Sequence, residues 1–306
     1  MTTHLSKKQK IYLCVYHNII SHKMKRILLF TLALLPIMVS CEKDKIEEEE
    51  KVTIKLNVTN LTEDGYFDGL LYYKVTSNSP CEVCVNKADK TATIVEIPSR
   101  IEINGNVYTC TSIADKAFYE CRSLSSIIIP KTIKSIGARA FEGCYALKIV
   151  TIPESVTSID FCAFYGCSGL TSITIPKGVT RIEASTFCDC SELTSIIIPE
   201  GVTRIEQDAF FYCSRLTTIT IPESVSTIGG FVFGGCSGLK TVVCKRRTPP
   251  TCDVNVFIKE IEDVHGYTQY VPYTQSVTLY VPTGSKEAYQ NSEPWNGFKE
   301  IIEEEL

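Results

Sequence analysis

The chain has 306 residues, of which 44% are hydrophobic and 22% charged, so its composition is that of a folded protein rather than a disordered one. Residues 1–40 contain six basic residues and no acidic one, which leaves 25 basic against 35 acidic residues in the remainder. This acidic balance argues against a nucleic-acid-binding function, because phosphate contacts need a surplus of Lys and Arg on one face.

Residues 1–40 have the layout of an upstream extension followed by a secretory signal peptide. From Met24 the chain reads MKRILLFTLALLPIMVSC, with a basic start, an apolar run over 27–39 and a small residue before Cys41. The run is too short to cross a bilayer as an ordinary helix. The tetrapeptide MVSC is similar to the lipobox of bacterial lipoproteins, and this resemblance implies that Cys41 is lipidated and that residues 1–23 precede the true start. An uncleaved membrane anchor is the alternative.

Residues 41–51 are predicted to be an acidic tether. The stretch EKDKIEEEEK that follows Cys41 cannot bury enough apolar surface to fold. An acidic stretch in this place resembles the export signal of Bacteroidota-type lipoproteins. The resemblance implies a lipid-anchored protein on the outer face of the outer membrane, at the cell surface, with the periplasmic face as the alternative.

Residues 52–110 are predicted to form an N-terminal β cap. The segments VTIKLNVT (52–59) and GLLYYKV (69–75) are typical of strands, and residues 101–108 of a hairpin that turns at Asn104 and Gly105. Cys81 and Cys84 have the C-x-x-C spacing of zinc and redox sites, but they lack the second pair or the βαβ context of such sites. A local disulfide, a metal or redox site and incidental thiols all remain open for them.

Residues 111–244 repeat one pattern with a period of 23 residues. Such self-similarity indicates one supersecondary unit stacked on copies of itself, each coil burying its face against the next. Four residue types recur at this spacing. They are the prolines Pro130, Pro153, Pro176, Pro199 and Pro222; the phenylalanines Phe118, Phe141, Phe164, Phe187, Phe210 and Phe233; the leucines Leu124, Leu147, Leu170, Leu193, Leu216 and Leu239; and the cysteines Cys121, Cys144, Cys167, Cys190, Cys213 and Cys236.

Each repeat contains an alternating stretch such as LTSITI (170–175), which is typical of a half-buried strand. Ile173 and Ile175 are expected to face the core, whereas Ser172 and Thr174 face solvent. A proline ends the strand, a second short extended piece (179–182) follows, and the Ala-Phe segment closes the coil. The sequence therefore predicts a β-rich solenoid with a β-hairpin N-terminal cap and a small α/β C-terminal cap.

The repeat is similar to the BspA-like leucine-rich repeats of Bacteroidota surface lipoproteins, whose unit runs I-P-x-x-V-x-x-I-x-x-x-A-F-x-x-C-x-x-L-x-x-I. The similarity covers about residues 94–244, with Thr186 and Val232 in place of the family alanine. The resemblance implies a leucine-rich-repeat fold and a role in adhesion or host-protein binding, with extracellular-matrix proteins among the kinds of partner.

The cysteine ladder is predicted to be core packing. Each ladder cysteine occupies a slot that suits a small apolar side chain, and free Cys is among the most buried residue types. Disulfides between successive coils are the alternative for an exported protein, although side chains in register point the same way, which is poor geometry for a bridge. A metal ladder is disfavoured, because zinc needs convergent tetrahedral ligands.

Residues 245–306 are predicted to form the C-terminal cap. The sequence SVTLYVPTGSKEAYQNSEPWNGFKEIIE (276–303) indicates a strand, a short helix from about Ser285, and Trp295 with Phe298 as lids on the last coil. Cys244 and Cys252 flank the stretch KRRTPPT, so a small disulfide loop and incidental thiols are both open for this pair.

The loop over residues 261–275 interrupts the repeat pattern and carries Tyr267, Tyr270 and Tyr273. Aromatic side chains on a loop suit contact with carbohydrate or protein. These three tyrosines are therefore the candidate glycan contacts, with packing onto the cap as the alternative.

Histidine is scarce, and His265 is the only one beyond the predicted signal region. No nucleophile motif lies near it, so Ser-His-Asp and Cys-His chemistry are disfavoured. An enzyme that uses a pair of carboxylates is the remaining catalytic alternative. The sequence therefore predicts a protein that is not an enzyme, with no catalytic residue, no cofactor and no metal site.

The outward positions of the repeat strands are the candidate binding face, since broad regular faces are how solenoids dock partners. The hydroxyl-bearing positions are Ser126, Thr151, Ser172, Thr174, Ser195, Thr218, Thr220 and Thr241. We expect a cell-surface lipoprotein that binds an extracellular or host macromolecule, a protein before other classes, contacts the membrane only through its lipid, and binds no nucleic acid. A glycan-binding accessory protein of a surface nutrient-uptake system is the alternative function. A further alternative is that the outward strand positions form a solvated sheet surface that binds nothing.

Overall fold

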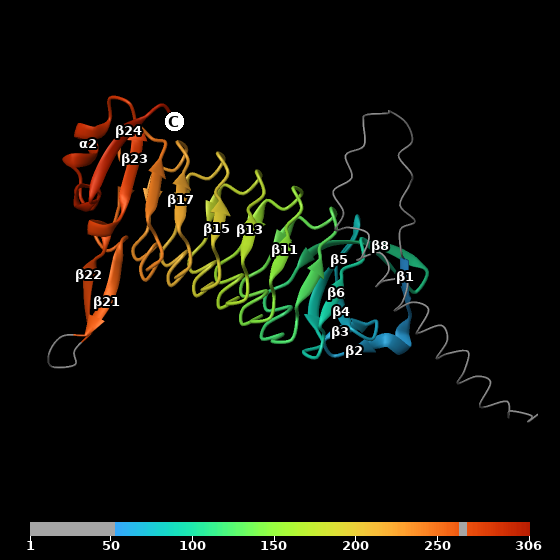
Figure 1. The fold of residues 1–306 in the computed structure, drawn as a ribbon. Coiled ribbons are helices and arrows are strands. Elements are labelled where there is room, and N and C mark those ends of the chain that lie inside the picture. The colour runs from blue at the N-terminus through green and yellow to red at the C-terminus, as the bar shows by residue number, and fades with distance from the viewer. Residues whose placement is uncertain (1–52, 263–267) are drawn as a thin grey trace, which may run out of the picture. The chain divides into compact units, whose positions relative to one another are not determined.

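The computed structural model describes residues 53–262 and 268–306 (Figure 1). The predicted signal peptide, Cys41, the acidic tether over 41–51, His265 and Tyr267 lie outside these residues. Within them, no helix is long and apolar enough to cross a membrane.

The N-terminal cap is a twisted sheet that continues directly into the first coils. Its strand order is β1-β7-β8-β5-β4-β3-β2, and β10 and β12 of the coils are attached through β8. The bounds are β1 Thr53–Leu56, β2 Leu61–Thr62, β3 Gly65–Phe67, β4 Leu71–Asn78, β5 Cys81–Ala88, β7 Arg100–Ile103 and β8 Asn106–Ile113, with the 3-10 turn η1 at Val58–Asn60.

The predicted hairpin is confirmed as the antiparallel pair β7–β8. Asn104 and Gly105 form its turn with φ of +51° and +82°, the left-handed conformation that an Asn-Gly turn requires. β8 then runs on past residue 110 to pair in parallel with β10 of the first coil. The predicted boundary between cap and repeats therefore falls within a continuous strand.

The coils are built from two columns of parallel strands (Figure 1). One strand per coil contributes to a five-stranded sheet, β15-β13-β11-β9-β6, and a four-stranded sheet, β17-β19-β23-β24. Their bounds are β6 Ile94–Glu96, β9 Ser126–Ile128, β11 Ile149–Thr151, β13 Ser172–Thr174, β15 Ser195–Ile197, β17 Thr218–Ile221, β19 Thr241–Cys244, β23 Thr278–Pro282 and β24 Glu300–Glu304. The second column consists of the short strands β10 Ser135–Ile136, β12 Ser158–Ile159, β14 Arg181–Ile182, β16 Arg204–Ile205, β18 Thr227–Ile228 and β20 Thr251–Cys252.

The core is one continuous cluster from Leu56 to Ile301, because every coil places the same residue types against the same types in the next. Phe118, Phe141 and Phe164 stack with centroids 5.0 and 5.1 Å apart, and the stack continues through the remaining phenylalanines at 5.6–5.7 Å. The predicted solenoid is confirmed, as is the burial of Ile173 and Ile175 behind the exposed Ser172 and Thr174.

The ladder cysteines are buried free thiols, as the core-packing interpretation requires. From the second coil onward each thiol also donates a hydrogen bond to the carbonyl of the phenylalanine 26 residues earlier. The distances are 3.2 Å from Cys144 to Phe118 and 3.3 Å from Cys190 to Phe164. The alternative of disulfides between successive coils is not realised.

The C-terminal cap closes the phenylalanine stack as predicted. Phe257 extends the stack with its centroid 5.4 Å from that of Phe233, so the regular core continues beyond residue 244. Trp295 and Phe298 then cover Phe257 edge-on at 5.7 and 5.0 Å. The predicted helix is α2 (Lys286–Gln290), between β23 and the 3-10 turn η3 (Trp295–Gly297).

One element of the C-terminal region was not predicted. The interrupting loop contains an antiparallel hairpin, β21 (Ile258–Glu262) and β22 (Thr268–Pro272), which projects from the end of the solenoid and is followed by the 3-10 turn η2 (Thr274–Ser276) (Figure 1).

Candidate functional site

Parallel pairing places the candidate residues in two straight columns on the outer face of the coil sheets. In the first column Ser126, Ile149, Ser172 and Ser195 are successive register partners, and Thr218 pairs with Thr241 further along. In the second column Ile128 pairs with Thr151, Thr174 with Ile197, and Thr220 with Val243. We call these two columns together the sheet face.

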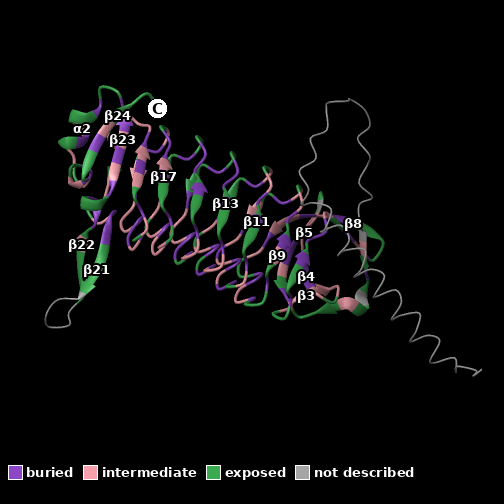
Figure 2. Cartoon of the chain, in the orientation of Figure 1, coloured by how far each residue is buried: buried purple, intermediate pink, exposed green. Residues whose placement is uncertain are grey.

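All eight predicted hydroxyl positions are exposed or half-buried, and Figure 2 shows that the coil strands carry both exposed and buried residues. Thr151, Ser172, Thr174, Ser195 and Thr218 are exposed, whereas Ser126, Thr220 and Thr241 are half-buried. The alternation along each strand places these residues on its outer face. This position does not test whether they bind a partner, so their role in binding stays a prediction.

The largest exposed side chains of the sheet face are isoleucines, which the candidate set omitted. Ile149 and Ile197 are 63% and 65% exposed, and Ile128 and Ile94 are 42% and 55% exposed. Ile94 extends the first column because its strand β6 pairs with β9. The signal was already in the sequence, because all four stand at the outward positions of strands.

The sheet face is uncharged between β9 and β19, and the charges stand at the strand ends. Lys148 and Lys240 are exposed just before their strands, and Lys131, Glu154, Lys177, Glu200 and Glu223 are exposed just after the strand-ending prolines. Hydroxyls and isoleucines can be desolvated at much lower cost than charges. The sheet face therefore has the uncharged centre and charged rim that characterise protein-binding surfaces.

The tyrosines of the interrupting loop divide between surface and core. Tyr270 is 53% exposed and meets the Phe231 ring edge-on at 5.9 Å. The carboxylate of Glu260, its partner across the hairpin, raises the pKa of the Tyr270 and Tyr212 phenols, that of Tyr212 to about 12.

Tyr273, the third of the alternative glycan contacts, is buried in the cap. Its side chain is 7% exposed, its ring meets Phe257 edge-on at 6.5 Å, and its hydroxyl donates a 2.7 Å hydrogen bond to the carbonyl of Phe233. Tyr273 is part of the cap core, as the packing alternative stated, because the chain turns inward after β22 to rejoin the coils.

Among the remaining candidate cysteines, Cys84, Cys244 and Cys252 are free. Cys84 is buried, and burial raises the pKa of its thiol. Cys244 accepts a 3.1 Å hydrogen bond from the Tyr289 hydroxyl, and Cys252 lies half-buried near Trp295. The proposed disulfide loop between Cys244 and Cys252 is therefore not formed.

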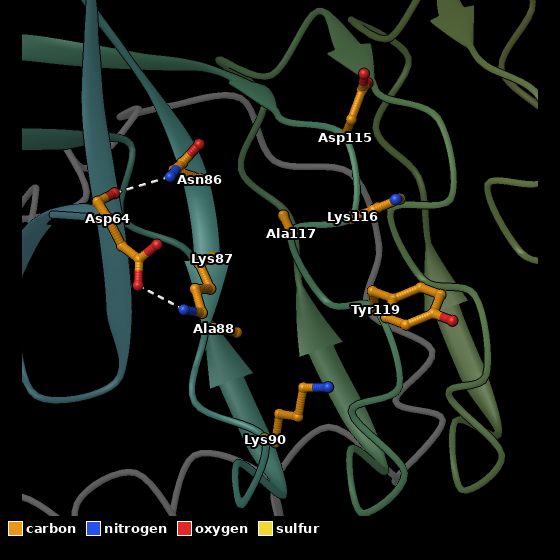
Figure 3. Close-up of a pocket in the computed structure, with 9 residues that line it drawn as sticks. All are labelled: Asp64, Asn86, Lys87, Ala88, Lys90, Asp115, Lys116, Ala117 and Tyr119. Carbon is orange, nitrogen blue, oxygen red and sulfur yellow. Dashed lines mark hydrogen bonds and ion pairs between the residues drawn. The ribbon is translucent and has the colours of Figure 1, made fainter.

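A cavity of about 390 Å³ lies where the N-terminal cap meets the first coil (Figure 3). Its side chains come from the end of β5 and the turn after it, from the β2–β3 turn, and from the first phenylalanine-bearing loop. They are Asp64, Asn86, Lys87, Ala88, Lys90, Asp115, Lys116, Ala117 and Tyr119. Sequence reasoning missed this site, because these segments are up to about 50 residues apart and carry no shared motif.

Comparison with known proteins supports the repeat assignment. Residues 111–240 match the model of the BspA type leucine rich repeat region in six copies. The fold is similar to a leucine rich cell surface protein from Faecalibacterium prausnitzii, at 23% identity and a TM-score of 0.54, covering 78% of this chain and 73% of that one. It is also similar to the leucine rich repeat protein of T. pallidum, at 27% identity and a TM-score of 0.53, covering 58% of this chain and 81% of that one. No curated protein matches the chain.

Proposed function

We propose that this protein is a cell-surface lipoprotein that uses its leucine-rich repeats to bind another protein, in adhesion or contact with a host. The observation that supports it best is the sheet face, which is uncharged between β9 and β19 and there carries the exposed Ile128, Ile149 and Ile197 among hydroxyls. Exposed apolar groups that stand together on a regular surface indicate an interaction site.

Display at the cell surface is supported by two further observations. The lipobox-like tetrapeptide before Cys41 and the acidic stretch after it are the features of an exported lipoprotein. The similar F. prausnitzii protein is described as a cell surface protein. The partner in this proposal is an extracellular or host protein, and the protein touches the membrane only through the lipid on Cys41.

The test is a binding screen of the purified full chain against immobilised matrix proteins, mucins and glycans. A protein partner found in this screen is expected to lose at least tenfold in affinity with Thr174→Lys and Thr220→Lys together, since a buried unpaired ammonium is costly at an interface. Gln207→Lys with Gln290→Lys adds the same two charges at exposed positions outside the sheet face and is the matched control. Equal loss in the control contradicts a role for the sheet face.

The second candidate function is glycan binding through the exposed ring of Tyr270. It is favoured by the position of that ring on a projecting hairpin, where it rests against Phe231. In the same screen it predicts binding to sugars alone, which Tyr270→Ala abolishes and the paired lysine substitutions leave unchanged.

A further inference from the structure

The cavity between cap and first coil gathers three lysines in a chain that is otherwise acidic. Lys87 and Lys90 come from the end of β5 and the turn that follows, and Lys116 comes from the loop that carries Phe118. Lys90 and Lys116 are both exposed, so their ammonium groups are open to a ligand. These segments are separated in the sequence and are brought together by the fold, so the cavity forms only when the cap packs against the first coil.

The acidic groups of the cavity are already engaged. The carboxylate of Asp64 forms an ion pair with Lys87, while that of Asp115 accepts a 2.9 Å hydrogen bond from the backbone N–H of Ala138 in the next coil. Figure 3 shows Asp64 turned to Lys87, and Asp115 apart from Lys90 and Tyr119. Lys87 thus neutralises the Asp64 carboxylate, Asp115 keeps its charge, and Lys116 is the lysine of the cavity that has no ion pair among the described residues.

Lys90 and Lys116 flank one aromatic ring. Their ammonium nitrogens lie 5.6 and 6.0 Å from the centroid of Tyr119. Lys90 also has a long contact of 3.9 Å with Glu120, whereas among the described residues Lys116 forms no ion pair. An anion within reach of the Lys116 ammonium group gains a charge-assisted hydrogen bond, and the charge of Lys90 near the same ring adds to the attraction.

The other side chains that line the cavity favour a sugar as well as an anion. The Tyr119 ring offers an apolar face and a hydroxyl, and Asn86, whose amide nitrogen donates to the Asp64 carbonyl at 2.8 Å, keeps its amide oxygen as an acceptor. A pyranose presents an apolar ring face and several hydroxyls, and a uronic or sialic acid adds a carboxylate. A volume of about 390 Å³ is within the range of small-molecule sites.

We infer that this cavity binds the carboxylate-bearing sugar of an acidic glycan. Lys116 pairs with the carboxylate, Lys90 adds positive charge near it, Tyr119 packs on the sugar ring, and Asn86 accepts a hydrogen bond from a hydroxyl. The site uses none of the residues of the sheet face, so it is a second binding function that stands or falls independently of the first.

Titration calorimetry on the full chain tests this assignment. The probe is a tetrasaccharide of alternating glucuronic acid and N-acetylglucosamine, and the neutral comparison is a tetrasaccharide of N-acetylglucosamine alone. We expect saturable binding of the acidic probe that weakens as salt is raised, and at least tenfold weaker binding of the neutral one. Equal binding of the two, or no binding of the acidic probe, overturns the proposal.

Variants assign the contacts. Lys90→Met with Lys116→Met is expected to weaken binding at least tenfold, whereas Lys286→Met with Lys299→Met removes the same charge at exposed positions on the C-terminal cap and is expected to have less than a twofold effect. Tyr119→Leu is expected to weaken binding and Tyr119→Phe to preserve most of it. Equal loss in both lysine pairs, or competition by inorganic phosphate at the same concentration, shows attraction to charge alone and overturns the sugar site.

Discussion

The ladder thiols combine two roles that an ordinary apolar side chain cannot combine. Each fills a small slot between neighbouring coils, and each donates its S–H to a backbone carbonyl, as Cys213 does to Phe187 at 3.2 Å. The sequence predicted the first role, because the cysteines share the period of the core columns. It could not predict the second, because the carbonyl that accepts the bond belongs to a residue 26 positions earlier.

This burial makes stability sensitive to alkaline pH. Burial raises the pKa of Cys121 to about 11 and that of Cys236 to about 12, and raises those of Cys167 and Cys213 well above 9. In the unfolded chain the thiols ionise near pH 8.5, so above this pH the unfolded state binds fewer protons than the native state. The thiol contribution to stability is therefore complete below about pH 8.5 and is lost as pH rises towards the native pKa values.

Urea unfolding under reducing conditions checks this prediction. Each buried thiol is expected to lower the free energy of unfolding by about 1.4 kcal/mol per pH unit between pH 9 and 11. Replacing Cys190 and Cys213 by Ala together is expected to make the decline shallower by about twice that amount per pH unit, although it lowers stability at pH 7. If the free energy of unfolding falls with pH at the same slope in the parent protein and in the double variant, the prediction is contradicted.

Tyr273 marks the limit of sequence reasoning at the scale of single residues. It lies in an insertion that interrupts the repeat pattern, which favours a surface position. Its hydroxyl nevertheless donates a hydrogen bond to the Phe233 carbonyl, and its ring packs edge-on against Phe257. Which loop aromatic returns to the core depends on where the hairpin ends, and no local pattern specifies this.

At the scale of the coil, the sharp corners depend on left-handed backbone at two positions in each repeat. One series runs Glu120, Gly143, Gly166, Asp189, Tyr212 and Gly235, with φ between +53° and +73°. Glycine takes this conformation freely, whereas other residues are strained by about 1–2 kcal/mol. The chain fills half of these corners with side-chain-bearing residues, so the corner is enforced by stacking on its neighbours.

Gly166 isolates the cost of the corner. A Cβ at this position has no neighbour closer than 3.8 Å, so Gly166→Ala introduces backbone strain without a clash. We expect it to lower the free energy of unfolding by about 1 kcal/mol. Gly166→Asn is the control, because Asn tolerates the left-handed region, and we expect a smaller loss. Chemical denaturation measures both, and a neutral Gly166→Ala contradicts the assigned strain.

The repeated elements were predictable and the inserted ones were not. A period of 23 residues specifies strand, proline and phenylalanine in every coil, and all appear in the structure. The hairpin β21–β22 has no periodic partner in the chain. Its first strand reads IKEIE, in which the adjacent Lys259 and Glu260 interrupt the alternation of apolar and polar residues that predicts a strand.

At the scale of the whole molecule, the two ends of the solenoid communicate only through the coils between them. The cavity that we assign to an acidic sugar depends on this arrangement, because its lysines come from the cap and from the first coil. Solenoid stability is approximately a sum of terms within coils and between neighbours. A destabilising substitution in one cap is therefore expected to lower the unfolding temperature of the coils next to it before that of the coils at the other end.

The single tryptophan reports on this separation. Trp295 lies fully buried on the C-terminal cap, so its fluorescence follows that end, whereas far-ultraviolet circular dichroism follows all the coils. Tyr73 lies fully buried in the N-terminal cap, with its hydroxyl donating to Asp68 at 2.7 Å. Tyr73→Ala is expected to cost about 3–5 kcal/mol locally, since it removes a large buried ring.

We expect thermal unfolding of Tyr73→Ala to begin at lower temperature by circular dichroism while the fluorescence midpoint stays within about 1 °C of the parent protein, because the far end keeps its neighbour contacts. Tyr289→Phe, which removes a hydrogen bond to the Arg246 carbonyl beside Trp295, is the opposite case and is expected to lower the fluorescence midpoint first. If both signals shift together in both variants, the solenoid unfolds as one cooperative unit. In that event the continuous core from Leu56 to Ile301 transmits stability over its full length, and nearest-neighbour terms alone do not describe the molecule.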